Sequence, residues 1–459
     1  MPMAASAPLA APSPPLPRPA VAAISGILLA SGLAVALLWP DQAGLALAAV
    51  FGVIVLLLAF AFPTLACMGW LVAVGLTPDM WFGEFFGDGV AVSVVAALKF
   101  AGLLLVVLSL LRYGPAWDGF NPGFAFAAMF AVGIVHGLHP NLDAGESFRS
   151  FLGSAAPFAF CFVRLPREWS RGVILAVLGL PLASILLGAV LTVAGLHPLL
   201  VEGAGLRLQG AGHPAFLAGF ALTAMYAALT ELLRTGKWRF VFALALNLAI
   251  LVLTGARAPL AIGMAVTFLA LIAAPSARFS WPARCALLLG FGVIGAILFA
   301  AGSALNTMRI FNLLATDAEN LSGRDEIWPL FQAAWDASPW WGWGVGAGKV
   351  LVDVDSPLAR LLGTTAAHNE YLRSGVEGGY VGLTLLVMFF VLWAWTHLRV
   401  LRGSDRAIMA LVLIGFAVHS ATDNTLIATT SSVLFTWVIS VFARDARLAE
   451  VANLPEKTA

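Results

Sequence analysis

Ser322-Gly323-Arg324-Asp325-Glu326-Ile327-Trp328 and His368-Asn369-Glu370-Tyr371-Leu372 lie in the only long polar stretch of an otherwise apolar chain, from about Asn306 to Glu377. This stretch holds nine of the 24 acidic residues and the aromatic run Trp340-Trp341-Gly342-Trp343. On both sides of it, apolar runs of helix length follow one another. Irregular and functional backbone belongs in such segments, and the tryptophan content argues against disorder. We therefore expect the polar stretch to be the active part of the molecule.

The composition is that of a polytopic membrane protein. Of 459 residues, 61% are hydrophobic and only 11% are charged, whereas soluble domains carry about 25% charged residues. The mean hydropathy is +0.93. A net charge of +1 gives no indication of nucleic-acid binding. The three cysteines, Cys67, Cys161 and Cys285, lie in apolar runs without metal-ligand spacing, which predicts small core residues.

A membrane-spanning helix needs about 20 apolar residues. Candidate spans run near 21–39, 43–61, 89–111, 123–139, 172–195, 213–233, 240–255, 258–274, 285–303, 378–396, 407–422 and 426–443, with shorter runs at 63–76 and 151–163 that fit spans or re-entrant pieces. The sequence thus predicts an all-α polytopic membrane protein with 12–14 transmembrane helices and one large periplasmic loop containing short helices. Its parts are a disordered cytoplasmic tail (1–19), an N-terminal helix bundle (20–303), the catalytic loop (304–377), C-terminal helices (378–443) and a cytoplasmic tail (444–459).

The basic residues orient this arrangement. If every run spans, one side with both tails receives 16 of the 25 basic residues, so that side is predicted to be cytoplasmic. The polar stretch then faces outward, which in a bacterium means the periplasm. No internal repeat is visible, which disfavours transporters built from duplicated halves.

Nine basic residues do not follow this distribution. Lys99 lies within a span, where a charge indicates a functional site. Eight others lie on the outer side, where a bound anion would account for them: Arg149, Arg207, Arg257, Arg309, Arg324, Lys349, Arg360 and Arg373. Arginine suits this task because its planar fork pairs two phosphate oxygens and keeps its charge.

Three of these arginines stand out by their context. Arg207 lies just before a span, and Arg257 lies at a hairpin tip between two spans. Arg324 opens a helical pattern in which Ile327, Trp328, Phe331, Ala334 and Trp335 share one face. The alternative reading is that each is an ordinary surface arginine whose stem snorkels along apolar surface.

His368 differs from the other six histidines because it begins a helical pattern that runs into the span at 378. A helix N-terminus disfavours the imidazolium, so the ring is expected to stay neutral and able to accept a proton. The alternative is a structural histidine bonded within the loop. The pair Asp353 and Asp355 resembles the short acidic pair of metal-dependent sugar-nucleotide enzymes, but such pairs are common, and we interpret them as loop residues.

Four motifs, in this order, resemble the O-antigen ligase and polymerase superfamily. They are Thr254-Gly255-Ala256-Arg257, Gly323-Arg324 with Trp328, Gly342-Trp343-Gly344-Val345-Gly346, and His368-Asn369-Glu370-Tyr371-Leu372. The resemblance covers roughly residues 207–380. It implies that Arg257 and Arg324 bind the donor diphosphate and that His368 is the essential histidine, with Arg207 matching a looser motif. The same motifs give Trp328, Asn369, Glu370 and Tyr371 as substrate-binding candidates.

The resemblance implies an inner-membrane glycosyltransferase that takes a glycan from undecaprenyl diphosphate on the periplasmic face. A ligase passes it to lipid A–core or a related acceptor, and a polymerase passes it to another lipid-linked repeat unit. The expected transfer inverts the anomeric carbon and needs neither a metal ion nor a cofactor. Its partners are the lipid-linked donor, the glycan acceptor and the bilayer. A polysaccharide or lipid transporter is the alternative from another class.

Overall fold

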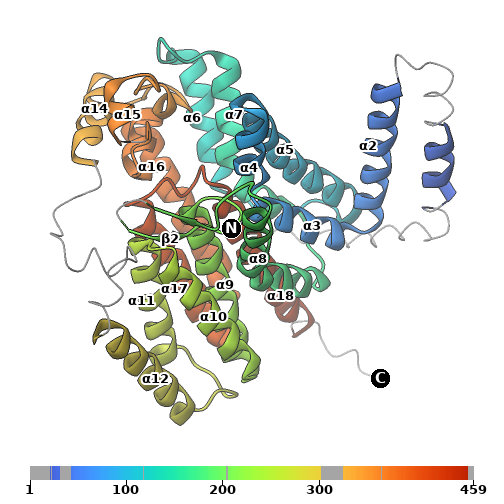
Figure 1. Ribbon diagram of the computed structural model, residues 1–459, viewed down its shortest axis with the longest axis vertical. Helices are drawn as coiled ribbons and strands as arrows, with labels where there is room; N and C mark the ends of the chain where they lie inside the picture. The colour runs from blue at the N-terminus through green and yellow to red at the C-terminus, as the bar shows by residue number, and fades with distance from the viewer. Residues whose placement is uncertain are drawn as a thin grey trace, which may run out of the picture.

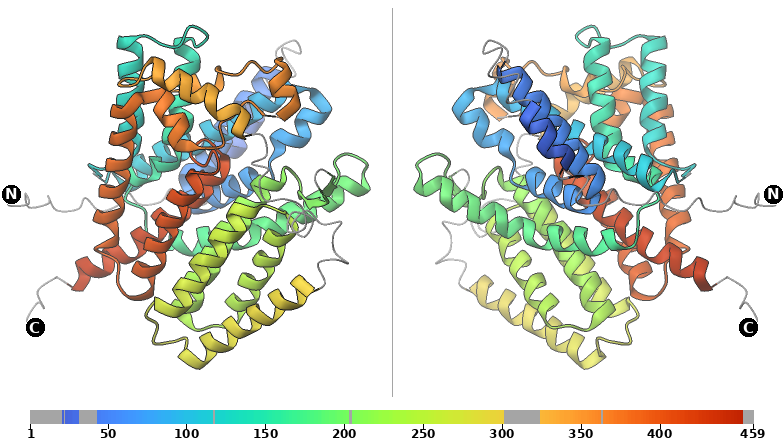
Figure 2. Two further views of the ribbon diagram at one scale, coloured as in Figure 1. Left: turned by 90° about the vertical axis from the view of Figure 1, so that its left-hand side faces the viewer. Right: turned by 90° about the vertical axis from the view of Figure 1, so that its right-hand side faces the viewer.

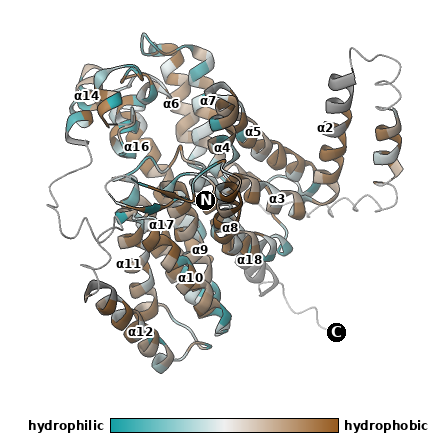
Figure 3. Ribbon diagram, in the orientation of Figure 1, coloured by the Kyte–Doolittle hydropathy of each residue, from teal (hydrophilic) through white to brown (hydrophobic). Residues whose placement is uncertain are grey.

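The structure, a computed structural model, describes residues 21, 23–31, 43–116, 118–202, 205–300, 324–362 and 364–452. The predicted tail at 1–19, parts of the span at 21–39, Arg309 and the side chain of Arg324 fall outside the described residues. Helices dominate these ranges, and Figure 3 shows that most of them are apolar, with hydrophilic residues gathered around α14. The predicted all-α membrane architecture is confirmed.

The labelled elements follow one another as shown in Figure 1. They are α2 (Ala43–Ala61), α3 (Pro63–Gly75), α4 (Pro78–Phe86), α5 (Asp88–Tyr113), α6 (Gly123–His136), α7 (Ala144–Ala155), η2 (Ala156–Phe162), α8 (Glu168–Val193), β1 (Leu200–Val201), β2 (Arg207–Leu208), α9 (Pro214–Thr235), α10 (Arg239–Leu253), α11 (Arg257–Ala273), α12 (Trp281–Ala300), α14 (Arg324–Ala337), η3 (Ala347–Lys349), α15 (Pro357–Leu362), α16 (Glu370–Leu398), α17 (Gly403–Ser420) and α18 (Thr429–Ala452). The two short strands pair antiparallel, with Val201 opposite Arg207.

Fewer helices meet a membrane-spanning length than the 12–14 predicted. Among the described residues, four are long and apolar enough, within α5, α8, α9 and α16, and a bent pair at 120° makes up to five. The bent pair joins α2 to α3 at Pro63, because proline favours the first turn of a new helix. Other apolar runs form shorter helices such as α6, α10, α11 and α12, and the run at 151–163 ends in the 3₁₀ segment η2.

Helix α9 forms the centre of the bundle. Its most apolar window is 89% buried, against 22% for α5 and α16, because α8, α10, α11, α17 and α18 surround it. Small residues allow this close packing: a Cβ added at Gly219 would lie 2.7 Å from the Thr430 side chain of α18. Cys67 and Cys161 are buried as predicted, whereas Cys285 is exposed on α12.

A second apolar cluster supports the polar stretch. Ile327 and Phe331 of α14 are buried against Leu372 and Val376 of α16, with Trp328, Ala334 and Trp335 packed beside them. The helical face predicted for α14 is therefore confirmed. Both views in Figure 2 show the polar stretch (orange) with α6 and α7 at one end of the molecule, and α10 and α12 toward the other end.

The tryptophan turn is built into a kink of α16. Gly379 has a φ of +61°, and the turn supplies carbonyl partners where the helix breaks: Tyr380 N–H donates to Pro339 O (2.7 Å) and Val381 N–H to Trp340 O (3.2 Å). In return, the Trp343 N–H donates to Val376 O at 2.8 Å. The turn therefore satisfies backbone groups that a kink would otherwise leave unpaired.

We expect Gly379→Ala to destabilise the protein. The left-handed conformation costs a non-glycine residue about 1–2 kcal/mol, and the new Cβ would lie 2.3 Å from the Trp340 carbonyl carbon. Thermal unfolding in detergent measures the effect. Gly290→Ala in α12 is the matched control, because no atom lies within 4 Å of its added Cβ. Equal unfolding midpoints for the two variants would contradict the role given to the kink.

Candidate active site

His368 lies at a polar junction just before α16. Its Nδ1 is 3.1 Å from Asp423 Oδ1 and its Nε2 is 3.2 Å from Thr364 Oγ1. The residue has a φ of +48°, a region that costs a residue with a Cβ. An ionised carboxylate only accepts hydrogen bonds, so Nδ1 carries a proton toward Asp423. In the neutral ring, Nε2 is then an acceptor that faces the Thr364 hydroxyl.

The backbone around His368 is fixed on both sides. On one side, the Trp328 indole donates to Ala367 O at 2.7 Å. On the other, the Asn369 side chain caps α16 by accepting from the Tyr371 and Leu372 N–H groups, both at 3.1 Å. Trp328 and Asn369, predicted to bind substrate, therefore hold the histidine loop in place.

Asp423 was not predicted from the sequence. It lies between α17 and α18, accepts from the Asn424 N–H at 2.8 Å, and lies 3.7 Å from His419 Nε2. Burial raises the pKa of this carboxyl, but the hydrogen bond to His368, the charge of His419 and the Asn424 N–H outweigh it, so the pKa is lowered. The signal that could have identified it is Thr422-Asp423-Asn424, a polar group between two apolar runs.

A buried ionic network brings Asp423 to His368. Arg373 donates through Nε to Glu370 Oε2 and through Nη1 to Glu377 Oε2, both at 2.6 Å, and Glu370 Oε1 accepts from the Leu426 N–H at 2.7 Å. Glu370 is 2% exposed. Glu370, predicted to contact substrate, ties α16 to the α17–α18 loop. Arg373, one of the outer arginines for which an anion was expected, is neutralised by two glutamates.

Arg207 and Arg257 meet at one turn. The Arg207 Nε donates to Thr254 O at 2.9 Å, in the turn that joins α10 to α11. Gly255 makes this turn tight with a φ of +64°, and Arg257 then opens α11 with an exposed side chain. The structure thus places Arg207 and Arg257, both singled out from the sequence, at the same turn between α10 and α11.

The same end of the bundle holds the Arg257 turn and the Asp423 loop. A Cβ added at Gly415 of α17 would lie 3.0 Å from Ile262 of α11, and Pro275 after α11 lines one cavity with Gly403 at the start of α17. These contacts show that α11 and α17 run antiparallel, side by side in Figure 1. Ile262 and Gly415 are each five residues from the helix ends at Arg257 and Ser420, so those ends lie at about the same level.

Arg324 begins α14, the helix that carries Trp328 one turn later. The loop of His368 is therefore attached to the helix that Arg324 opens. Tyr371 packs on the other side of α16, where its hydroxyl donates to Ala417 O at 2.8 Å.

An apolar cavity of about 340 Å³ extends from Tyr371 along α16 and α17. Its lining includes Ser374 near the histidine loop and Leu398 at the far end of α16. The lining residues of α16 lie on both sides of its kink at Gly379. The cavity suits a long apolar chain.

The remaining candidates lie elsewhere. Asp353 Oδ1 accepts from the Asp355 N–H at 2.9 Å, and Asp355 pairs with Arg360 at 3.6 Å, so both act within their own loop. No group of three or more His, Cys, Asp or Glu residues in the described ranges is arranged to hold a metal ion. Lys99 on α5 lies near Gly153, where an added Cβ would be 3.1 Å from its Nζ.

Residues 242–387, about a third of the chain, match the family described as O-antigen ligase. No curated protein matches the chain. The matched segment includes Arg257, Arg324 and His368, and it confirms the resemblance over that range to the O-antigen ligase and polymerase superfamily. The match supports a ligase- or polymerase-type function on lipid-linked glycans, and with the apolar helices it indicates an integral membrane protein.

We expect Asp423→Asn to reduce glycan transfer strongly. The amide can donate to Nδ1 and favour the wrong tautomer, leaving Nε2 protonated, and general-base loss costs about 10²- to 10⁴-fold. Asp336→Asn, on the exposed face of α14, is the matched control and should transfer normally. Single-turnover transfer with purified protein measures both variants. Normal transfer by Asp423→Asn would show that the carboxylate does not orient His368.

Proposed function

Because residues 242–387 match the O-antigen ligase family, we propose that this chain is an O-antigen ligase-like glycosyltransferase. It transfers a glycan from undecaprenyl diphosphate to a hydroxyl of lipid A–core or a related acceptor, at the periplasmic face of a bacterial inner membrane. The observation that carries the proposal is the His368–Asp423 pair, with Nε2 directed at a hydroxyl at 3.2 Å.

His368 acts as the general base for the acceptor. The Thr364 hydroxyl occupies the position in which an acceptor hydroxyl would donate to Nε2. As the acceptor hydroxyl oxygen bonds to the anomeric carbon, the proton of that hydroxyl moves to Nε2 of His368. The bond from the anomeric carbon to the diphosphate oxygen breaks at the same time. Asp423 then stabilises the imidazolium. Attack opposite the leaving group inverts the anomeric configuration.

The arginines stabilise the leaving diphosphate. Negative charge grows on it as the bond breaks, so fixed positive charge there lowers the barrier. Arg257 is exposed at the N-terminus of α11, where the helix dipole also favours an anion. We assign Arg324 to the same role, with Arg207 supporting the turn and the charge. This stabilisation operates without a metal ion or cofactor.

We assign the apolar cavity along α16 and α17 to the part of the donor's prenyl chain nearest the diphosphate. The cavity begins beside Tyr371, three residues after His368, and its walls are mainly aliphatic and aromatic. A chain lying there would present its diphosphate at the end of the bundle that holds the Arg257 turn. Tyr371 is therefore assigned to the mouth of the donor site.

The two ends of α9 support the proposed orientation. Arg207 precedes its first residue, whereas Arg234 and Lys237 follow at its other end, about 33 Å away for 22 residues. Arg167, Arg171 and Arg239 join them at this second end. The basic end is cytoplasmic by the positive-inside rule, which leaves His368 outside.

Arg257→Lys should lose most activity, nearly as much as Arg257→Ala. A lysine keeps the charge but lacks the planar fork that pairs two phosphate oxygens. Arg360→Lys, in an exposed pair with Asp355, is the matched control. Transfer rates at equal protein level give the comparison. Full activity of Arg257→Lys would exclude bidentate diphosphate binding by Arg257.

Deletion of the gene, followed by a gel of extracted lipopolysaccharide, tests the function itself. We expect all long chains on lipid A–core to disappear while lipid-linked polymer persists. Core carrying a single repeat unit would instead assign a polymerase. Unchanged lipopolysaccharide together with unchanged exopolysaccharide would contradict both functions.

A further inference from the structure

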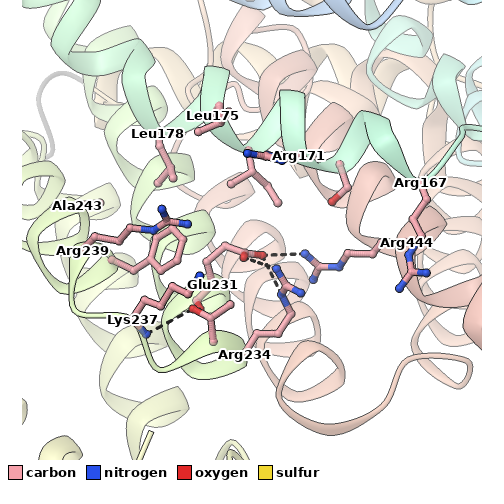
Figure 4. A pocket seen from close by; sticks show the side chains of 14 residues that line it. Arg167, Arg171, Leu175, Leu178, Glu231, Arg234, Lys237, Arg239, Ala243 and Arg444 are labelled. Atoms are coloured by element: carbon pink, nitrogen blue, oxygen red, sulfur yellow. Dashed lines mark hydrogen bonds and ion pairs between the residues drawn. The ribbon is translucent and has the colours of Figure 1, made fainter. Parts of the chain in front are cut away.

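We propose that a cationic cavity at the second end of α9 binds the phosphate-bearing headgroup of an anionic membrane lipid. The cavity, of about 710 Å³, is formed by the first turns of α8 and α10, the last turn of α9, and α18 (Figure 4). Six basic side chains line it: Arg167, Arg171, Arg234, Lys237, Arg239 and Arg444. We call it the basic pocket. It lies far from the His368 site and does not depend on the proposed transfer reaction.

Glu231 is the one acidic residue that lines the pocket, and its oxygens are already occupied. It is 4% exposed, and it accepts from Arg234 Nε at 3.1 Å and from Arg444 Nη1 at 2.7 Å. Arg444 also donates to the buried Asp405. This network fixes two cations at the base of the pocket and leaves Glu231 no capacity to neutralise the others.

The remaining four cations have no carboxylate partner among the described residues. Arg167 and Arg171 lie four residues apart at the start of α8, and Lys237 and Arg239 lie beside the start of α10. In Figure 4, Arg171 lies on α8, with Arg239 to its left and Arg444 to its right. The Arg239 guanidinium lies 4.8 Å from the centroid of the Phe240 ring, which holds it at the wall. Mutual repulsion makes this grouping costly until an anion is bound.

The two helix starts add to the positive potential. The aligned peptide dipoles of α8 and α10 place partial positive charge at these two starts, and both starts lie at the pocket. Arginine forks and helix N-termini are each suited to phosphate oxygens. The chemistry of the pocket therefore suits a phosphate group.

An apolar track leaving the pocket indicates that the phosphate belongs to a lipid. Leu175 lines the pocket and is 58% exposed, and Leu182, Leu186 and Val190 continue the same exposed face of α8. Leu178 and Ala243 add further apolar side chains to the wall of the pocket. A free phosphate would leave this wall in water, whereas a lipid places its headgroup on the cations and its acyl chains along α8.

The test titrates the purified full-length chain in detergent with phosphatidylglycerol, and separately with phosphatidylcholine, and counts bound lipid by native mass spectrometry. We expect phosphatidylglycerol to bind and phosphatidylcholine to bind at least tenfold more weakly. Arg171→Gln should weaken phosphatidylglycerol binding about fivefold, the typical contribution of one cation. Arg171→Glu should weaken it further.

Arg399→Glu, an exposed arginine after α16 that does not line the pocket, is the matched control and should bind like the parent. Equal binding of the two lipids, or equal loss in Arg171→Gln and in the control, would overturn the proposal. A competition arm separates the two sources of phosphate: displacement of phosphatidylglycerol by millimolar inorganic phosphate would assign the pocket to a free anion instead. Because the readout is lipid binding, it is independent of glycan transfer.

Discussion

The buried ionic network of Arg373 with Glu370 and Glu377 is the interaction on which the candidate site depends. It lies at the start of α16, and Glu370 extends it to the Leu426 N–H in the α17–α18 loop. Loss of one partner from such a buried network costs about 3–5 kcal/mol, because the remaining charges cannot leave the protein interior. The network also positions the site, since it brings the loop that carries Asp423 against His368, two residues before α16.

The rest of the polar segment makes that position rigid. The tryptophan turn fills the break in α16 at Gly379, and α14 packs its apolar face against the helix just above it. The Trp328 indole then fixes Ala367, the residue before His368. A strained φ at His368 is stable only because these contacts determine it from several directions. The histidine loop is thus a product of helix packing rather than of its own sequence.

Much of this arrangement was predictable from local patterns. The α14 face follows from 3.6-residue spacing, and the Arg257 turn follows from a short polar tip between two apolar runs. Asp423 could not be predicted in the same way, because its partner is 55 residues away and only tertiary packing joins them. The sequence also could not show that burial and the bonds to Arg373 and the Leu426 N–H occupy the Glu370 carboxylate; its substrate-binding role stays a prediction.

Hydropathy measures composition and not helix direction or length, so it does not show how an apolar run is divided. The chain turns by 120° at Pro63, and several apolar runs form helices of 14–17 residues. The distribution of basic residues predicted the orientation of the bundle more directly than hydropathy predicted its helices. The basic residues mark one end of α9, where four of the six that line the basic pocket have no carboxylate partner in the part of the chain that the structure describes. They also separate that end from the arginines beside the Arg257 turn.

The most direct test of the catalytic proposal is single-turnover glycan transfer by His368→Ala, measured beside binding of the lipid-linked donor. If His368 is the general base oriented by Asp423, transfer falls about 10²- to 10⁴-fold while donor affinity stays unchanged. Transfer at the parent rate would show that His368 is structural. Loss of donor binding would place the histidine with the diphosphate-binding arginines and contradict its role in acceptor activation.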